Sequence, residues 1–362
     1  MSSTDIRVVP GPANYFSHRG SLARLADFYS DEQLSRAFWI YGERAIAGAR
    51  PFLPEAFNAP GAKHCLFTGH CSETDVAQLA QTAGDDRAVV IGVGGGALLD
   101  TAKALARRLG LPFVAIPTIA ATCAAWTPLS VWYNDAGQAL HFEIFDDANF
   151  LVLVEPQIIL NAPAEYLLAG IGDTLAKWYE AVVLAPQPEE LPLTVRLGIN
   201  GALAIRDVLL AQSEQALADQ QRGELTQDFR DVVDAIIAGG GMVGGLGERY
   251  TRVAAAHSVH NGLTVLPQTE KFLHGTKVAY GILVQSALLG QDDVLAQLNA
   301  AYHRFHLPTR LAELEVDINN HEALDRVIAH TLRPVESIHF LPVNLTAETL
   351  RAAIEKVEFF GR

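Results

Sequence analysis

The chain has 362 residues, of which 49% are apolar, and its formal net charge is −14. A chain of this length folds into about two domains, each able to bury a core. Acidic composition without a Lys/Arg-rich run argues against a nucleic-acid partner. No apolar stretch reaches the about twenty residues of a membrane helix, and no signal-peptide pattern opens the sequence. The three cysteines form no CxxC pair, so we expect a cytoplasmic protein without membrane contact.

Through about residue 155, short β-rich runs alternate with helical patterns. The alternation predicts an α/β domain whose parallel sheet carries helices on both faces. The predicted strands are Ala37–Tyr41, His64–Phe67, Ala88–Gly92, Pro112–Ile116 and Phe150–Val154, the predicted helices are 44–49, 74–83 and 97–109, and Trp132–Leu140 reads as a small hairpin.

After Pro156 the sequence shows long stretches with helical hydrophobic periodicity and almost no β-strand patterns. The predicted helices are 164–184, 194–214, 226–243, 254–266, 278–289, 292–305 and 347–357. We therefore expect an α/β nucleotide-binding domain at residues 1–158 and an all-helical metal-binding domain at residues 159–362.

The strongest local signal is a glycine loop between a buried strand and a helix, Gly94, Gly95 and Gly96. Consecutive glycines let backbone amides approach a phosphate, and the helix N-terminus adds partial positive charge. The loop follows the third predicted strand and no acidic residue lies about twenty positions on, so it is not an ordinary Rossmann fingerprint. Asp100, in the first turn, is either part of the site or a partner of the helix dipole.

An apolar loop, residues 116–133, comes next. Loops at the carboxyl edge of a parallel sheet bind ligands, although a merely buried connection is an equal alternative. Its polar side chains are those of Thr118, Thr122, Cys123, Thr127 and Tyr133.

A second cluster lies in the helical half. Asp173 has apolar neighbours, His257 and His260 share a helix face, and His274 follows shortly after. A buried carboxylate needs a partner, and an ion pair with Lys177 is the simpler explanation. Histidine and carboxylate ligands also suit Zn²⁺ or Fe²⁺ with an open position for a substrate oxygen.

These motifs occur together in a recognisable order: the glycine loop with Asp100, IPTIA, GIGDTLAKW, AHSVHNG and HGTKVAYG. In this arrangement the whole chain resembles the glycerol dehydrogenase branch of the iron-containing alcohol dehydrogenase superfamily. The resemblance implies a dehydroquinate-synthase-like fold, NAD or NADP as cofactor, one divalent metal ion and a homo-oligomer.

The resemblance also implies roles for individual residues. Asp173, His257 and His274 would bind the metal ion, while His260 would lie near the nicotinamide as a candidate proton relay. The cofactor pyrophosphate would lie on the glycine loop beside Asp100. The nicotinamide side would be lined by Thr118, Thr122, Thr127, Leu129 and Tyr133.

The sequence departs from the branch at three positions. Lys177 stands where the iron enzymes carry a further histidine, which implies three protein ligands and favours Zn²⁺ over Fe²⁺. Cys123 replaces an aspartate that binds the polyol in glycerol dehydrogenases. Arg249, Tyr250 and Arg252 precede the histidine helix, where glycerol dehydrogenases tend to have small residues.

Gly42, at the end of the strand Ala37–Tyr41, takes the position of an acidic residue in NAD-preferring dehydrogenases. Glycine neither bonds a ribose 2′-hydroxyl nor repels a 2′-phosphate, and Arg44 could pair with that phosphate. Glu43 argues the other way. NADP is thus predicted ahead of NAD.

Together the features predict hydride transfer between NAD(P)(H) and a small 2-oxo or 2-hydroxy carboxylic acid. One alternative is oxidation of glycerol or another polyol with NAD. A second alternative, from another class, is a nucleotide-binding regulator that has lost catalysis.

Overall fold

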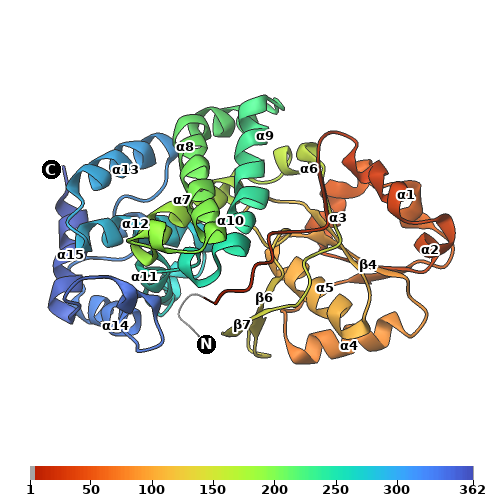
Figure 1. Ribbon diagram of the computed structural model, residues 1–362, viewed down its shortest axis with the longest axis horizontal. Coiled ribbons are helices and arrows are strands. Elements are labelled where there is room, and N and C mark those ends of the chain that lie inside the picture. Colours follow the sequence, from red (N-terminus) through yellow and green to blue (C-terminus); the bar gives the residue numbers. More distant parts are fainter. Residues whose placement is uncertain (1–4, 362) are drawn as a thin grey trace. The chain divides into compact units, whose positions relative to one another are not determined.

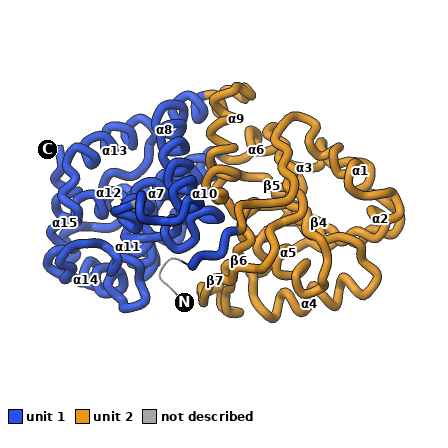
Figure 2. Tube along the Cα trace, viewed as in Figure 1, with its two compact units in different colours: residues 1–8, 164–218, 243–362 blue, residues 9–163, 219–242 orange. Residues whose placement is uncertain are grey.

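The chain forms two compact units in a computed structural model that describes residues 5–361. The sheet unit consists of residues 9–163 and 219–242, and the helical unit of residues 5–8, 164–218 and 243–361 (Figure 2). The predicted division into residues 1–158 and 159–362 does not include the return of residues 219–242 to the sheet unit, and as a division into domains it stays a prediction.

The sheet has six parallel strands in the order β1-β8-β5-β4-β2-β3. The predicted parallel α/β sheet is therefore confirmed. Figure 1 labels its strand β4 together with helices of the same unit. The strands are β1 (Asn14–Ser17), β2 (Ala37–Tyr41), β3 (Lys63–Leu66), β4 (Val89–Gly94), β5 (Phe113–Pro117) and β8 (Leu151–Val154). Strand β1 was not predicted, because its four half-buried residues show no apolar run.

Apolar side chains cover both faces of this sheet. On one face Trp39, Ile91 and Val114 belong to a core that includes Leu22 and Leu34 from the segments before β2. On the other face, a Cβ added to Gly92 would lie 3.0 Å from the Cβ of Ala102 in the long helix behind it. The α-helices of the sheet unit are α1 (Leu25–Phe28), α2 (Asp31–Ser35), α3 (Glu43–Ala49), α4 (Glu73–Ala83), α5 (Gly96–Leu109), α6 (Pro156–Leu160) and α9 (Gln227–Asp234).

The predicted hairpin Trp132–Leu140 is present with the expected turn, but its strands have other bounds than predicted. Its antiparallel strands are β6 (Leu129–Tyr133) and β7 (Ala139–Ile144), so the pairing extends outward at both ends. The turn forms as expected, since the side-chain oxygen of Asn134 accepts hydrogen bonds from the backbone of Ala136 and Gln138. Strand β6 begins three residues before the predicted start. Along it Ser130 and Trp132 are buried and the other residues are partly exposed, as in a strand with one buried face.

Specific contacts attach residues 219–242 to the sheet unit. The Gln220 amide donates to the backbone oxygens of Ile159 and Ala162 at 3.3 and 3.0 Å, and the Tyr15 hydroxyl donates to Asp234 at 2.6 Å. No local sequence pattern predicts these contacts, because each of them joins segments that are far apart in the chain.

Helices make up the second unit, and most of them follow the predicted ranges. The helix predicted over 226–243 is interrupted by a π-helical turn at Ala235–Gly239. The α-helices are α7 (Ala164–Leu184), α8 (Leu193–Arg222, which ends in the sheet unit), α10 (Gly240–Gly247, which begins there), α11 (Ala255–Leu263), α12 (His274–Leu288), α13 (Asp292–Phe305), α14 (His321–Thr331, not predicted) and α15 (Ala347–Phe359). Among the described helices none has an apolar span long enough to cross a bilayer.

Candidate metal and nucleotide sites

Asp173, His257 and His274 come together in the helical unit from helices α7, α11 and α12. Oδ1 of Asp173 lies 3.5 Å from Nε2 of His257 and 3.2 Å from Nε2 of His274. One candidate ligand atom from each residue lies within 4.8 Å of the others. Asp173 is buried, whereas the His274 side chain is 43% exposed, so the cluster is open on one side.

Glycines bring these helices unusually close together. A Cβ added to Gly275 would lie 1.8 Å from the backbone oxygen of Ala169, and one added to Gly172 would lie 2.5 Å from the oxygen of Gly275. Any side chain at either position would force α7 and α12 apart. Because Gly172 precedes Asp173 and Gly275 follows His274, the same contact places both ligand candidates.

Glu180, two turns after Asp173 on α7, holds His257. Its carboxylate is fully buried and lies 2.7 Å from Nδ1 of His257, and it also accepts from the backbone amides of Ala254 and His257. A carboxylate can only accept, so His257 carries a proton on Nδ1 and turns Nε2 toward Asp173.

The close packing of these groups also shifts their pKa values. Burial alone would raise the pKa of Asp173, but hydrogen bonds from His257 and His274 hold it well below its usual value. Burial works against a charged His257, yet Glu180 and Asp173 together raise its pKa to about 9. A metal ion at these ligand atoms would compete with protons for them, because its ligands must be deprotonated.

His260 lies against the cluster without joining it. Its Nε2 is 3.0 Å from Nδ1 of His274, and its Nδ1 is 3.0 Å from the side-chain oxygen of Asn261. Burial, followed by the nearby cationic groups, lowers the pKa of His260 well below its ordinary value.

In the sheet unit, the glycine loop leads from β4 into α5, with Gly95 as the N-cap of the helix. Gly95 has no side chain to cap the first-turn amides, and such a helix start suits an anion. A Cβ added to Gly96 would lie 3.1 Å from Oγ1 of Thr122, and the Thr118 amide donates to the Gly94 oxygen at 3.1 Å. The predicted glycine and threonine segments are therefore neighbours.

Asp100 has protein partners of its own. The Lys103 ammonium lies 3.3 Å from one carboxylate oxygen, and the amide of Val131 donates to the other at 3.1 Å. Lys103 also donates to the backbone oxygens of Ala124 and Leu129. Burial raises the pKa of Asp100, against the opposing effect of Lys103. This buried ion pair fastens the loop carrying Cys123 and Thr127, and strand β6 with Leu129 and Tyr133, to helix α5.

Gly42 is the N-cap of α3, at the carboxyl end of β2. Its φ of −87° is open to any residue, and a Cβ there would approach nothing closer than 3.8 Å. A tight turn therefore does not explain the glycine. Glu43 and Arg44, which follow it, are both exposed.

Arg249 and Arg252 differ in their surroundings. Arg249 donates to the backbone oxygen of Asp5 at 2.9 Å, pairs with Glu248 at 2.8 Å and lies over the Tyr250 ring. It thereby ties residues 5–8 to the helical unit. Arg252 is half-buried just before α11.

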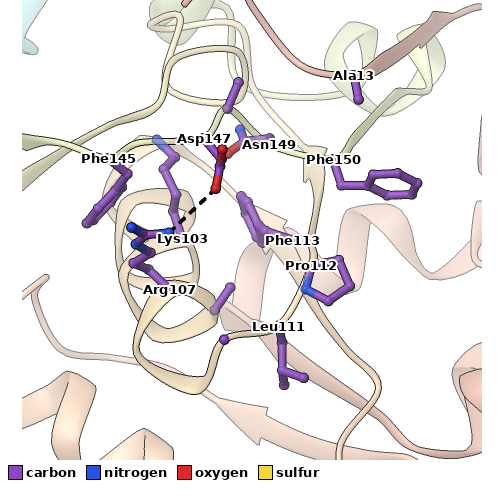
Figure 3. A pocket seen from close by; sticks show the side chains of 13 residues that line it. Ala13, Lys103, Arg107, Leu111, Pro112, Phe113, Phe145, Asp147, Asn149 and Phe150 are labelled. Carbon is purple, nitrogen blue, oxygen red and sulfur yellow. Dashed lines mark ion pairs between the residues drawn. The ribbon is translucent and has the colours of Figure 1, made fainter.

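A separate cavity of about 450 Å³ opens at the amino edge of the sheet, near the starts of β5 and β8 (Figure 3). Arg107 and Asp147 in its lining form an ion pair of 3.5 Å. None of the predicted site residues lines this cavity. The glycine loop lies at the opposite, carboxyl edge, where parallel α/β sheets bind ligands.

Four residues that contact the candidate residues, or one another beside them, were not predicted from the sequence. Glu180 and Lys103 had a weak signal, since each follows a candidate residue on the same helix face at a spacing of seven or three. Asn261 and Glu336, whose bond is 2.8 Å long, had none, because Glu336 lies in a turn far along the chain.

Known proteins resemble the chain over its full length. The family model described as iron-containing alcohol dehydrogenase matches residues 12–156. Hydroxycarboxylate dehydrogenase A of Escherichia coli (strain K12) is 82% identical over 360 residues, covering 99% of both chains. Glycerol dehydrogenase of Pseudomonas putida is 32% identical, covering 98% of both.

The chain belongs to the iron-containing alcohol dehydrogenase superfamily. Its relatives confirm the predicted glycerol dehydrogenase branch, and they favour an enzyme over an inactive regulator. The fold agrees: a crystal structure of glycerol dehydrogenase from Schizosaccharomyces pombe superposes with a TM-score of 0.85 at 29% identity, covering 98% of this chain and 91% of that one. The chain is thus a dehydrogenase.

The glycine contact between α7 and α12 gives a first prediction. Gly275→Ala should separate these helices, lowering the free energy of unfolding by about 1–3 kcal/mol or more and weakening the binding of any divalent metal ion at the cluster. Gly244→Ala is the matched control, since nothing lies within 4 Å of its added Cβ. It should stabilise helix α10 by up to about 1 kcal/mol. Thermal melting and zinc titration of both variants provide the measurement, and a Gly275→Ala protein with wild-type values would contradict the packing argument.

Proposed function

We propose that this dehydrogenase uses one divalent metal ion and NAD(P)(H) to interconvert a small 2-oxo acid and the corresponding 2-hydroxy acid. The observation that carries the proposal is the cluster of Asp173, His257 and His274, whose ligand atoms converge at one partly open point. The name of the 82% identical relative supports the class of substrate.

The donor set suits a metal ion on chemical grounds. One carboxylate oxygen and two imidazole nitrogens match Zn²⁺ or Fe²⁺ sites that keep a position open. Lys177 contributes no fourth imidazole, so we propose Zn²⁺ ahead of Fe²⁺. A bound ion supplies Lewis-acid polarisation of the substrate oxygen.

The sheet unit supplies the residues for the cofactor. The backbone amides of Gly94, Gly95 and Gly96, at the start of helix α5, would hold the pyrophosphate. Thr118, Thr122, Thr127, Leu129 and Tyr133 would line the nicotinamide side, on segments that the ion pair of Asp100 with Lys103 keeps in place. Asp100 would then act on the cofactor through these segments. The nicotinamide itself carries the hydride.

Two residues set the substrate class in this proposal. Cys123 offers no charged acceptor to a polyol hydroxyl, and Arg252 has the planar fork that binds a carboxylate. Oxidation of glycerol is the alternative function, supported by the glycerol dehydrogenase relatives.

We further propose a cytoplasmic homo-oligomer without nucleic-acid or membrane partners, in keeping with three free cysteines. Size-exclusion chromatography with light scattering tests the assembly.

Removing one ligand tests the metal site. His274→Ala should lose both bound Zn²⁺ and turnover, because a ligand atom disappears from the cluster. The control is His303→Ala, an exposed histidine on helix α13 of the same unit. Elemental analysis and NAD(P)H absorbance at 340 nm give the two readouts. Full turnover by a metal-free His274→Ala protein would refute the proposal.

Substrate preference separates the two candidate functions. A hydroxyl left without its partner costs about 1–3 kcal/mol, or roughly ten- to hundred-fold in rate. Glycerol should therefore turn over more slowly than 2-oxobutanoate or 2-oxoglutarate, and Cys123→Asp should raise kcat/KM for glycerol. Faster wild-type turnover of glycerol would favour polyol oxidation instead.

Cofactor preference depends on Gly42. The wild type should use NADPH at least as well as NADH, and Gly42→Asp should shift the ratio of kcat/KM toward NADH by roughly ten-fold or more, since about 1.4 kcal/mol of repulsion is enough. The Cβ fits, so the variant should fold normally. Gly48→Asp adds the same charge at another open position in α3 and serves as control. A tenfold wild-type preference for NADH, unaffected by Arg44→Ala, would overturn this assignment.

A further inference from the structure

A line of hydrogen bonds leads away from the metal-ligand candidate His274. Its Nδ1 lies 3.0 Å from Nε2 of His260, and Nδ1 of His260 lies 3.0 Å from Oδ1 of Asn261. The Asn261 amide then donates to the Glu336 carboxylate at 2.8 Å. Glu336 is 7% exposed, and Arg333 donates to its other oxygen at 2.5 Å.

The chemistry of the last member sets the direction of every bond. A carboxylate only accepts, so Asn261 must turn its NH₂ toward Glu336 and its oxygen toward His260. That oxygen also only accepts, and Nδ1 of His260 must therefore carry a proton. A neutral His260 then has a lone pair on Nε2, which accepts the proton on Nδ1 of His274.

The consequence falls on the far side of the His274 ring. With its proton on Nδ1, a neutral His274 presents a lone pair on Nε2, 3.2 Å from the Asp173 oxygen. A cation between these two acceptors, either a second imidazole proton or a metal ion, makes the contact favourable. Glu180 imposes the same tautomer on His257, so two carboxylates outside the cluster turn both Nε2 atoms toward Asp173.

We propose that Glu336 is a positioning residue that acts through Asn261 and His260 to fix the tautomer of His274 that can bind a divalent metal ion. His260 is then a link in this line, in place of the proton relay predicted from the sequence. The inference rests on the metal role proposed above for Asp173, His257 and His274.

Exchanging Glu336 for glutamine removes the constraint. A glutamine can donate from its NH₂ to the Asn261 oxygen, so the Asn261 amide can flip and turn its own NH₂ toward His260. Donor and acceptor then exchange in each hydrogen bond up to His274. The reversed line would put a proton on Nε2 of His274 and block the metal. Loss of such outer partners typically weakens metal binding by about 10- to 100-fold.

The test measures Zn²⁺ affinity by competition with a chromophoric chelator at pH 8, where ordinary imidazole is neutral. Glu336→Gln should bind Zn²⁺ about 10- to 100-fold more weakly than the wild type. The matched control is Glu358→Gln, since Glu358 is an equally buried carboxylate of the same unit that accepts from Tyr280 and Leu311. Its affinity for Zn²⁺ should stay within about two-fold of wild type, well below the effect of a lost partner.

A double variant separates positioning from mere structural support. The protein that carries both Asn261→Asp and Glu336→Gln has a carboxylate at position 261, next to His260. Its amide stands at position 336, where the wild type has a carboxylate. The carboxylate introduced by Asn261→Asp can again only accept from Nδ1 of His260, so Zn²⁺ affinity should return toward wild type. A purely structural role for Glu336 predicts no such rescue.

Each outcome bears on a separate claim. Wild-type affinity in Glu336→Gln, or no rescue in the double variant, overturns the role of Glu336. Zinc binding that His274→Ala leaves unchanged overturns the metal site itself. Should Glu336→Gln not fold, long-range ¹H–¹⁵N spectra of the histidines in zinc-loaded wild type decide the matter, because a proton on Nε2 of His260 contradicts the proposal.

Discussion

The candidate metal centre depends on a contact from which side chains are excluded. Helix α12 meets α7 at Gly275, where a single added carbon would lie 1.8 Å from the backbone oxygen of Ala169. This approach allows a ligand candidate from each helix, Asp173 and His274, to lie within 3.2 Å of one another. Any larger residue would move the two groups apart, and the third ligand candidate on α11 would then have no common point to face.

Packing brings the ligand candidates together, and the hydrogen bonds around them determine which histidine nitrogen faces the site. Two histidines can each expose either nitrogen, and a metal site needs the lone pair on a particular one. Glu180 acts on His257 directly, whereas Glu336 acts on His274 through two intermediate side chains. Both carboxylates are buried, so both need such donors, and the same bonds that satisfy them orient the ligands. In this account the stability of the unit and the chemistry of its site share the same interactions.

Local patterns in the sequence were sufficient for most of the fold. The β-rich runs that became β2, β4 and β5 are buried on both faces, which makes them continuous and easy to recognise. Strand β1 and the π-helical turn at Ala235–Gly239 were missed because tertiary contacts, such as Tyr15 with Asp234, decide them. The ligand candidates carried a signal because each lies in a motif of its own. The residues that orient them did not, since hydrogen-bond partners distant in sequence leave no local pattern.

The central claim is that Asp173, His257 and His274 bind one metal ion through a carboxylate oxygen and two Nε2 atoms. A zinc-edge anomalous difference map from crystals of the zinc-loaded enzyme tests it directly. The account predicts one peak per chain, about 2.0–2.2 Å from each of the three ligand atoms. A map without a peak at this cluster, or one in which an Nδ1 atom faces the ion, would contradict it.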